Sequence, residues 1–250
     1  MKSDLSIFRI NKAIPVPLYY QLKLCILDLI ENHTLNEGDL LPPENELCDS
    51  LGISRPTVRQ CLGELVSEGY LVRQKGKGTF VAPKRIDARF LNKLQTFNEE
   101  MRDRGLVPTC KLLQIEVVNP QNMINESLGL AKTDRLILLK RLRGVDNEPI
   151  MIQQNYLSYD KFHKLLEIDF STASLYHVLE EEYGLYIDYA HRSIQAANAT
   201  SKEAQLLQIN SGMAICIVTT VAYANRTTPV EYTISKYRGD RMNFGVELCR

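Results

Sequence analysis

The sequence predicts an α+β protein of two domains: a small helical domain that ends in a β-hairpin, and a larger domain built on an antiparallel sheet. Three observations predict this. Apolar residues recur at helical spacing in short segments before residue 70, and two β-like runs then flank a glycine-bearing turn. The remaining chain contains a strand–helix–strand–strand pattern twice. With 250 residues, 44% of them hydrophobic, the chain can form two such cores.

Charge is unevenly distributed along the chain. Thirty Lys and Arg residues balance thirty Asp and Glu residues, so the formal net charge is zero. Residues 17–52 carry one cation and seven anions, whereas residues 53–86 carry seven cations and two anions. A local positive block can bind phosphates even on a neutral protein, so zero net charge does not exclude a nucleic-acid partner.

Several classes of protein and site are disfavoured by what the sequence lacks. It contains no run of about 18 apolar residues, and residues 1–10 are too polar for a signal peptide, so we expect a cytoplasmic protein without membrane contact. The six cysteines show no C-x-x-C pair and no histidine spacing that suits zinc. We expect reduced thiols, no metal and no cofactor. The alternative is a redox sensor at Cys61.

Three helices are predicted in the first 70 residues. The first begins at Pro17, the second has Pro43 in its first turn and ends at Gly52, and the third is N-capped by Ser54 and closed by Gly69. The inward positions are Leu18, Leu22, Cys25, Ile26 and Leu29 in the first helix, and Val58, Cys61, Leu62 and Leu65 in the third.

A basic hairpin, with K-G-K-G at its tip, follows the third helix. Three short helices and such a hairpin form the layout of a winged helix-turn-helix, which binds double-stranded DNA. Arg55 and Arg59 lie one turn apart on the outward face of the third helix, where arginine can reach guanine, and Thr57 can pack on a thymine methyl. The alternative is a solvated helix face on which these arginines pair with Glu64 or Glu68.

Residues 40–81, LLPPENELCDSLGISRPTVRQCLGELVSEGYLVRQKGKGTFV, resemble the DNA-binding domain of the GntR family of bacterial transcription regulators. The resemblance covers about residues 15–83. One departure is Asn45, where many members have arginine, which implies a different operator contact. The DNA-contacting residues that the resemblance implies are Ser54, Arg55, Thr57 and Arg59 on the helix, and Lys75, Gly76, Lys77 and Gly78 on the wing.

The second half of the chain repeats itself. A strand, a helix and two strands joined by a turn occur first in residues 111–157 and again in residues 190–237. Leu128 matches Leu207 at an offset of 79, and Pro149 matches Pro229 at an offset of 80. A helical segment, SLYHVLEEEYG, joins the two units. This pattern predicts a duplicated antiparallel sheet with helices packed on it.

The pieces TFNEEMRDRG, LKRLRGVDNEP, SLYHVLEEEYG and PVEYTISKYRGDR resemble the UTRA effector domain of the HutC branch of GntR regulators. The resemblance implies a fold like that of chorismate lyase, without retained catalysis. It also implies a small polar ligand, often a sugar phosphate or amino-sugar phosphate, sometimes a phosphonate, an amino acid or a urocanate-like acid. The expected domains are a winged helix-turn-helix over 1–83, a linker over 84–90 and an effector-binding domain over 91–250.

Two arginines suggest where the effector binds. Arg141 and Arg143 are two residues apart and share one strand face, and two buried guanidiniums are costly unless an anion meets them. Thr96 can N-cap a helix whose free N–H groups at Phe97 and Asn98 would face an anion. The alternative is an exposed strand face on which the arginines pair with Glu148 or Glu231. The further pocket positions that the resemblance implies are Glu148, Ser174, Tyr176, Glu231 and Tyr237.

The prediction is therefore a homodimeric transcription regulator, a repressor, whose affinity for a near-palindromic operator depends on a small anionic effector. A second departure from the family, Gln153 in place of a glutamate, favours an anionic ligand. One alternative is the same regulator responding to a non-phosphorylated carboxylate, an amino acid or a phosphonate. A more distant alternative is an enzymatic C-terminal domain, which we do not expect because the sequence offers no positioned nucleophile or paired acid and base.

Overall fold

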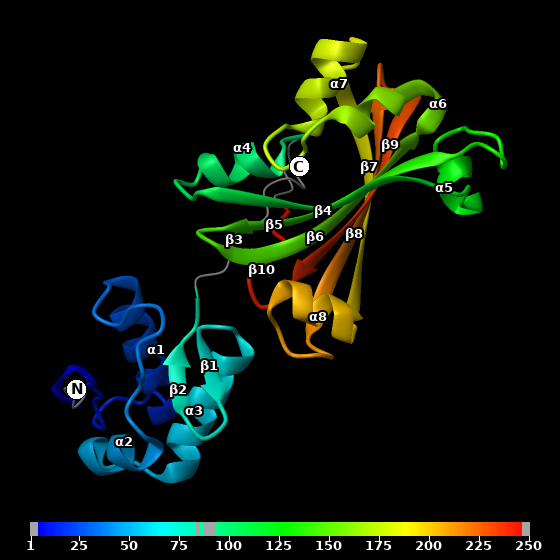
Figure 1. Ribbon diagram of the computed structural model, residues 1–250. Coiled ribbons are helices and arrows are strands. Elements are labelled where there is room, and N and C mark those ends of the chain that lie inside the picture. The colour runs from blue at the N-terminus through cyan, green and yellow to red at the C-terminus, as the bar shows by residue number, and fades with distance from the viewer. Residues whose placement is uncertain (1–4, 84–85, 88–93, 247–250) are drawn as a thin grey trace. The chain divides into compact units, whose positions relative to one another are not determined.

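The computed structural model describes residues 5–83, 86–87 and 94–246, and the chain divides into two compact units, Met1–Arg85 and Ile86–Arg250 (Figure 1). Residues 84–85 and 88–90 of the predicted linker lie outside the described residues. Ile86 and Asp87, also assigned to the linker, instead form strand β3, which pairs in parallel with β10.

The first unit contains the predicted helices and hairpin. Pro17 and Pro43 are the N-caps of their helices rather than first-turn residues, and Gly52 ends α2 in the left-handed conformation. Strands β1 and β2 pair antiparallel. The elements are η1 (Leu5–Ile7), α1 (Leu18–Glu31), α2 (Glu44–Leu51), α3 (Arg55–Ser67), β1 (Leu71–Gln74) and β2 (Gly78–Val81).

The core of the first unit forms where the predicted apolar stripes of α1 and α3 meet. Leu22, Ile26 and Val58 are fully buried, and so is Cys61, as the helical spacing predicted. Phe8, from the segment before α1, packs into the same core. No periodic pattern in the sequence indicated that contact, because Phe8 lies outside any long helix.

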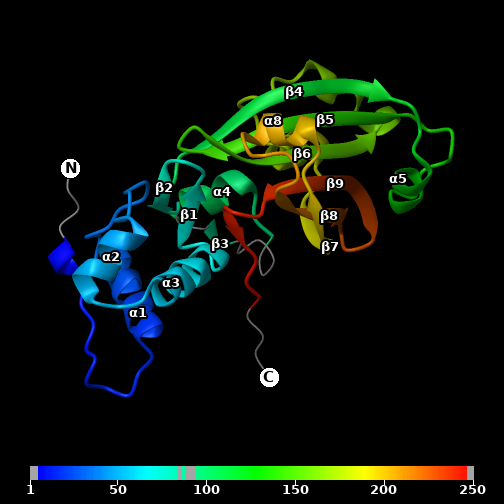
Figure 2. The same ribbon diagram turned by 90° about the horizontal axis from the view of Figure 1, so that it is seen from below.

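The second unit is a six-stranded antiparallel sheet of strand order β4-β5-β6-β9-β8-β7 (Figure 2). Each predicted repeat supplies three neighbouring strands, and the two repeats meet where β6 pairs with β9. The strands are β4 (Pro108–Val118), β5 (Leu136–Val145), β6 (Glu148–Ser158), β7 (Ile187–Asn198), β8 (Ala214–Ala224) and β9 (Thr228–Arg238), and the short parallel pair is β3 (Ile86–Asp87) with β10 (Met242–Asn243).

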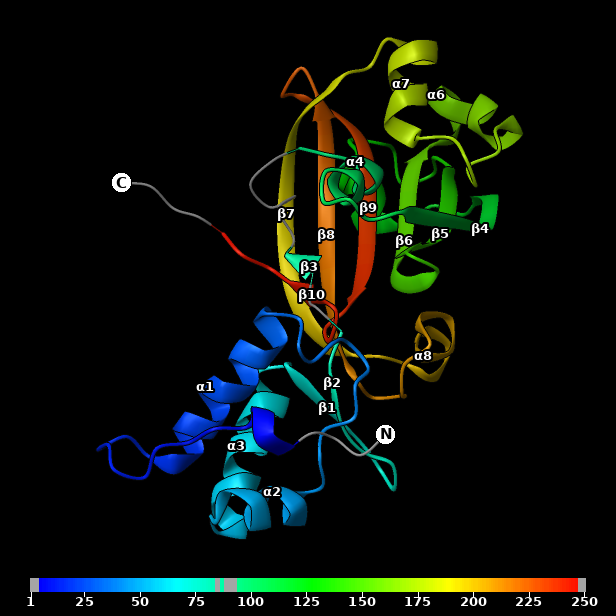
Figure 3. The ribbon, with the colours of Figure 1, turned by 90° about the vertical axis from the view of Figure 1, so that its left-hand side faces the viewer.

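Helices cover both faces of the sheet. On one face, α5 packs on Leu136 and Tyr156, and α8 packs on Ile152 and Ile215. On the other face, α7 packs on Leu139, and α4 shares a core with Tyr237 and Val218 of neighbouring strands (Figure 3). The helices are α4 (Phe97–Arg102), α5 (Asn122–Ser127), α6 (Tyr159–Phe162), η3 (His163–Glu167), α7 (Leu175–Tyr183) and α8 (Ser201–Leu207).

Candidate functional site

The first turn of α3 has a fixed start and exposed side chains, which a helix that contacts DNA bases requires. The Ser54 side chain accepts a hydrogen bond from the Thr57 backbone N–H at 3.4 Å, and this cap fixes where the helix begins. Arg55 and Arg59 are exposed, and Thr57 is half-buried beside them. The alternative pairing of these arginines with Glu64 or Glu68 does not occur. Both glutamates instead bond Lys23 of α1, and Arg59 lies against Glu44.

The hairpin tip is exposed and basic. Lys75 and Lys77 flank Gly76, and a backbone hydrogen bond from Lys77 N to Gln74 O closes the turn at 3.0 Å. Gly76 and Gly78 have φ angles of +73° and +125°, which glycine adopts most readily. The predicted wing therefore presents two lysines and an exposed glycine backbone together, and both kinds of group can bind phosphates.

Glu44, at the start of α2, links helix α3 to the wing hairpin. Its carboxylate lies 3.4 Å from Arg59 Nε of α3 and 3.2 Å from Arg73 of β1. Both arginines remain solvent-accessible, with 74% and 46% of their side chains exposed. One carboxylate thus orients two exposed arginines from two different elements.

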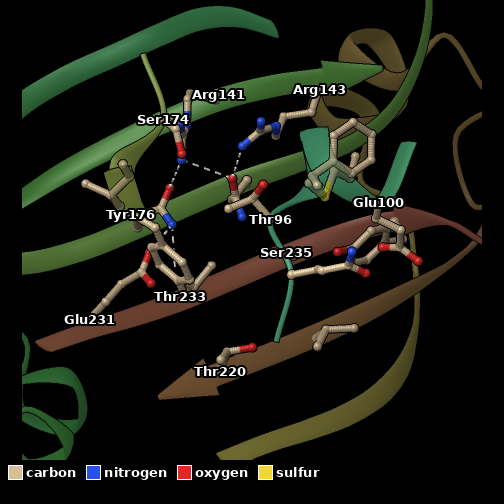
Figure 4. A pocket seen from close by; sticks show the side chains of 18 of the residues that line it. Thr96, Glu100, Arg141, Arg143, Ser174, Tyr176, Thr220, Glu231, Thr233 and Ser235 are labelled. Atoms are coloured by element: carbon tan, nitrogen blue, oxygen red, sulfur yellow. Dashed lines mark hydrogen bonds between the residues drawn. The ribbon is translucent and has the colours of Figure 1, made fainter. Parts of the chain in front are cut away.

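A pocket opens on the α4 and α7 side of the sheet (Figure 4). Its floor consists of side chains that alternate along five neighbouring strands. Arg141 pairs in register with Gln153, Gln153 with Ser235, and Ser235 with Val218. Thr220, two residues after Val218, pairs with Arg192 of the fifth strand, β7. The residues before α4 and the starts of α4 and α7 form the remaining wall. The lining residues are Gln95, Thr96, Phe97, Glu100, Arg141, Arg143, Met151, Gln153, Asn155, Ser174, Leu175, Tyr176, Arg192, Val218, Thr220, Glu231, Thr233, Ser235 and Tyr237.

Arg141 and Arg143 project side by side into this pocket, and Leu142 packs under α8 on the opposite face, as the alternation predicted. Both arginines are buried, and both donate to the Gln153 side-chain oxygen, at 3.2 and 3.1 Å. Neither Nε has a hydrogen-bond partner among the described residues. Burial, together with the neighbouring Arg143, lowers the pKa of Arg141 to about 10. In the described chain no carboxylate forms an ion pair with either guanidinium. Their hydrogen bonds go to side-chain amide oxygens, and Glu231 acts on Arg141 only through its charge.

Glu231 gives another part of the pocket the opposite character (Figure 4). It is fully buried and accepts a hydrogen bond from the Asn155 amide. Burial, followed by the neighbouring Glu231 carboxylate, raises the pKa of Tyr176, so this phenol stays protonated. Burial likewise raises the pKa of Tyr237. The pocket therefore combines a cationic part with a part that suits hydroxyl, amide or amine groups.

Most of the predicted effector residues lie together in this pocket, namely Thr96, Phe97, Arg141, Arg143, Ser174, Tyr176, Glu231 and Tyr237. Glu148 does not line it. Its carboxylate instead bonds Arg238 and Arg241 at 2.8 and 2.7 Å, because it begins β6 at the end of the sheet where β9 ends. The Thr96 side chain caps α4, and Glu99 completes a capping box, so a carboxylate already occupies that helix start.

Several lining residues were not predicted. Strand alternation from Glu231 places Thr233 and Ser235 on the same face, and that signal was available in the sequence. Asn155 shares a face of β6 with Gln153, which the sequence had already indicated as a position near the ligand, so Asn155 could have been predicted too. Arg192 comes from β7 at the sheet edge, where nothing in the sequence indicated which side chains face inward.

Within the described residues, no group of three or more His, Cys, Asp or Glu side chains could hold a metal ion. Among the helices described, none is both long and apolar enough to span a membrane.

Comparison with known proteins identifies both units. Residues 18–81 match the bacterial regulatory proteins of the gntR family, and residues 103–243 match the UTRA domain. The chain is 32% identical over 235 residues to the HTH-type transcriptional repressor NagR of Bacillus subtilis, covering 94% of this chain and 96% of that protein. The chain belongs to the GntR family. It is a regulator of the HutC type, with a helix-turn-helix DNA-binding region and a UTRA effector domain.

Other GntR proteins agree with this assignment. The probable transcriptional regulator PhnF of Escherichia coli K12 is 29% identical over 212 residues, covering 84% of this chain and 87% of that one. The crystal structure of PhnF from Mycobacterium smegmatis superposes with a TM-score of 0.66 at 25% identity, over 90% of this chain and 97% of that chain. The α+β fold expected from the resemblance is therefore confirmed.

Proposed function

We propose that this GntR regulator is a repressor that binds its operator as a homodimer and is controlled by a small anionic metabolite. A phosphorylated sugar or amino sugar fits the pocket best. The observation that carries this proposal is the pair of buried guanidiniums, Arg141 and Arg143, whose charge the described residues leave unpaired. An anion would supply the negatively charged acceptor that both guanidiniums lack, and a partner for their unbonded Nε atoms.

The neighbouring polar side chains could bind the hydroxyl groups of a sugar that carries the anionic group. Glu231 accepts and Tyr176 can donate hydrogen bonds, while Thr220, Thr233 and Ser235 offer hydroxyls along the sheet. Three arginines and two glutamates line the pocket, which leaves an excess of positive charge. A phosphorylated amino sugar would place its phosphate on the arginines and its hydroxyl and amine groups toward Glu231.

The DNA side of the proposal rests on the exposed first turn of α3. Arg55, Thr57 and Arg59 would contact bases or adjacent phosphates, and Ser54 and wing residues 75–78 would hold the backbone. Effector binding would favour a dimer whose two winged helices do not match successive half-sites. The leverage of the effector is limited by its difference in affinity between the two arrangements.

A thermal-shift panel tests the effector class. The panel contains glucose 6-phosphate, glucosamine 6-phosphate, a phosphonate and unphosphorylated carboxylates and amino acids, each with wild type, Arg141→Gln and Arg226→Ala, an exposed arginine in the β8–β9 turn. A ligand at about 100 times its Kd adds roughly 2.7 kcal/mol of stability. We expect a phosphorylated sugar to stabilise wild type and Arg226→Ala but not Arg141→Gln.

Other outcomes separate the alternatives. Stabilisation only by a carboxylate or a phosphonate would replace the phosphorylated sugar with that class. Stabilisation that persists fully in Arg141→Gln would refute the arginine pair as the anion site. Conversion of any stabilising ligand into a product would favour an enzymatic C-terminal domain instead.

A further inference from the structure

Glu148 connects the end of β9 to the start of β10, two segments that are close in sequence and lie at one end of the sheet. Its two carboxylate oxygens bond Arg238, the last residue of β9, and Arg241, which precedes β10, at 2.8 and 2.7 Å. Asp240 binds Arg238 from the other side through two further hydrogen bonds of 3.0 and 2.7 Å. Both arginine side chains are only 9% exposed, so their orientation is fixed by these partners.

Arg241 connects this cluster to the first strand of the effector domain. Its backbone oxygen accepts a hydrogen bond of 2.7 Å from Ile86 N, and Met242 then pairs with Ile86 as β10 runs parallel to β3. Ile86 is the first residue of the second unit, directly after the division of the chain. The ion pair between Glu148 and Arg241 thus fixes the strand through which the DNA-binding domain is joined to the effector domain.

The same strand pair shares a packed core with the pocket wall. Ile86 and Met242 belong to one hydrophobic cluster with the pocket residues Phe97, Met151 and Tyr237. Tyr237 also contacts Phe244, just after β10, with ring centroids 5.6 Å apart. A displacement of Tyr237 on ligand binding would therefore act on β10 through packing, and on Arg238, the next residue of β9, through the backbone.

We propose that Glu148 is a coupling residue, which transmits the state of the effector pocket to β3 without touching the effector. The inference rests on the proposed function, because it describes how that pocket would regulate DNA binding. A single carboxylate that bonds both Arg238 and Arg241 makes the end of β9 and the β10–β3 pair move together. Without this carboxylate, the pocket can still bind its ligand, but a movement of β9 is no longer passed on to β3.

The test compares Glu148→Gln with a matched control, Glu203→Gln, which removes the charge from a different partly buried ion pair, that of Glu203 on α8 with Lys236 on β9. The operator Kd of the full chain is measured with and without glucosamine 6-phosphate and glucose 6-phosphate. We expect the probe to weaken operator binding by wild type and Glu203→Gln. Glu148→Gln should bind the probe within about twofold of wild type and yet show little change in operator Kd.

The outcomes separate this inference from the proposed function. If Glu148→Gln responds to the probe as wild type does, the coupling role is refuted while the proposed function stands. If wild type itself responds to neither probe, the proposed control by a phosphorylated sugar fails, and the coupling inference fails with it.

A second variant guards against loss of folding in Glu148→Gln. Arg241→Gln breaks only the β10 side of the cluster and leaves Arg238 paired with Glu148 and Asp240. Hydrogen exchange of the Ile86 amide should accelerate in both variants and stay at the wild-type rate in Glu203→Gln. Unchanged exchange at Ile86 in a folded Arg241→Gln protein would overturn the proposal.

Discussion

Arg141 donates a hydrogen bond of 3.2 Å to the Gln153 side-chain oxygen, the same oxygen that accepts from Arg143. This neutral amide orients two buried cations without cancelling their charge. A carboxylate at position 153 would orient the two arginines equally well and would remove the excess of positive charge from the pocket. If the effector is an anion, as proposed, the identity of residue 153 decides how strongly the pocket attracts it.

Gln153→Glu should abolish the preference for an anionic ligand. A buried carboxylate in contact with both guanidiniums would repel an incoming phosphate, and we expect its affinity to fall about tenfold or more. Gln154→Glu is the control, because residue 154 lies on the same strand but is not part of the pocket lining. Calorimetric titration with the ligand found by the thermal-shift panel measures the ligand affinity of both variants. Equal affinities in the two variants would contradict this electrostatic account.

Arg55→Ala should weaken specific DNA binding by about 1–3 kcal/mol if its guanidinium reads a base. The operator is obtained by selection from random duplexes with the full chain, and affinity for it is compared with affinity for a scrambled duplex. Arg226→Ala serves as the charge-matched control. If Arg55→Ala lowered the affinity for both duplexes equally, Arg55 would contact a phosphate rather than a base.

Glu44→Gln should reduce the specificity of DNA binding rather than its strength. The Glu44 carboxylate orients Arg59 and Arg73, so its loss frees both side chains, while the removal of a negative charge strengthens non-specific binding to phosphates. We expect the ratio of operator to non-specific affinity to fall about threefold or more.

Glu46→Gln provides the comparison, since Glu46 is exposed in the same first turn of α2 and forms no ion pair with a described residue. It should strengthen binding to both duplexes and leave their ratio unchanged. A ratio that falls equally in both variants would show that charge alone, and not the orientation of Arg59 and Arg73, is responsible.

Cys61 should be inert toward thiol reagents while the protein is folded. It is fully buried on α3, and burial, followed by the nearby Glu64, raises the pKa of its thiol to about 12. At pH 8 on the order of one thiol in ten thousand would then be ionised. Titration with an aromatic disulfide before and after denaturation, compared with Cys61→Ala, measures this. A thiol that reacts in the folded protein would support the redox-sensor alternative.

The raised pKa of Cys61 has a consequence for stability. In the unfolded chain the thiol releases its proton near the ordinary cysteine pKa of 9.0, whereas the folded chain retains the proton up to a pKa of about 12. The contribution of this thiol to stability is therefore complete below pH 9 and decreases as the pH rises toward 12. Denaturant unfolding should show a steeper loss of stability above pH 9 in wild type than in Cys61→Ala.

The sequence predicts local features well because they depend on neighbouring residues. The Ser54 cap, the left-handed Gly52 and the shared face of Arg141 and Arg143 all follow from short-range geometry. Glu148 was misplaced because its partners are Arg238 and Arg241, about ninety residues away, and their proximity depends on how β6 pairs with β9. Long-range register is not encoded in a local pattern.

The pocket shows the same division. Alternation from Glu231 extends to Thr233 and Ser235, so these could have been predicted, whereas Arg192 enters from the far edge of the sheet. The repeat offsets of 79 and 80 residues indicated two units, but not that they meet along β6 and β9. That contact brings Gln153 and Asn155 of one repeat against Ser235 and Thr233 of the other.

In the proposed function, an anion held by Arg141 in the effector domain controls DNA binding. The most direct test is fluorescence anisotropy of a labelled operator bound to wild type or Arg141→Gln, titrated with glucosamine 6-phosphate. We expect the sugar phosphate to release DNA from wild type and to leave the variant bound. Release from both proteins at the same ligand concentration would contradict it.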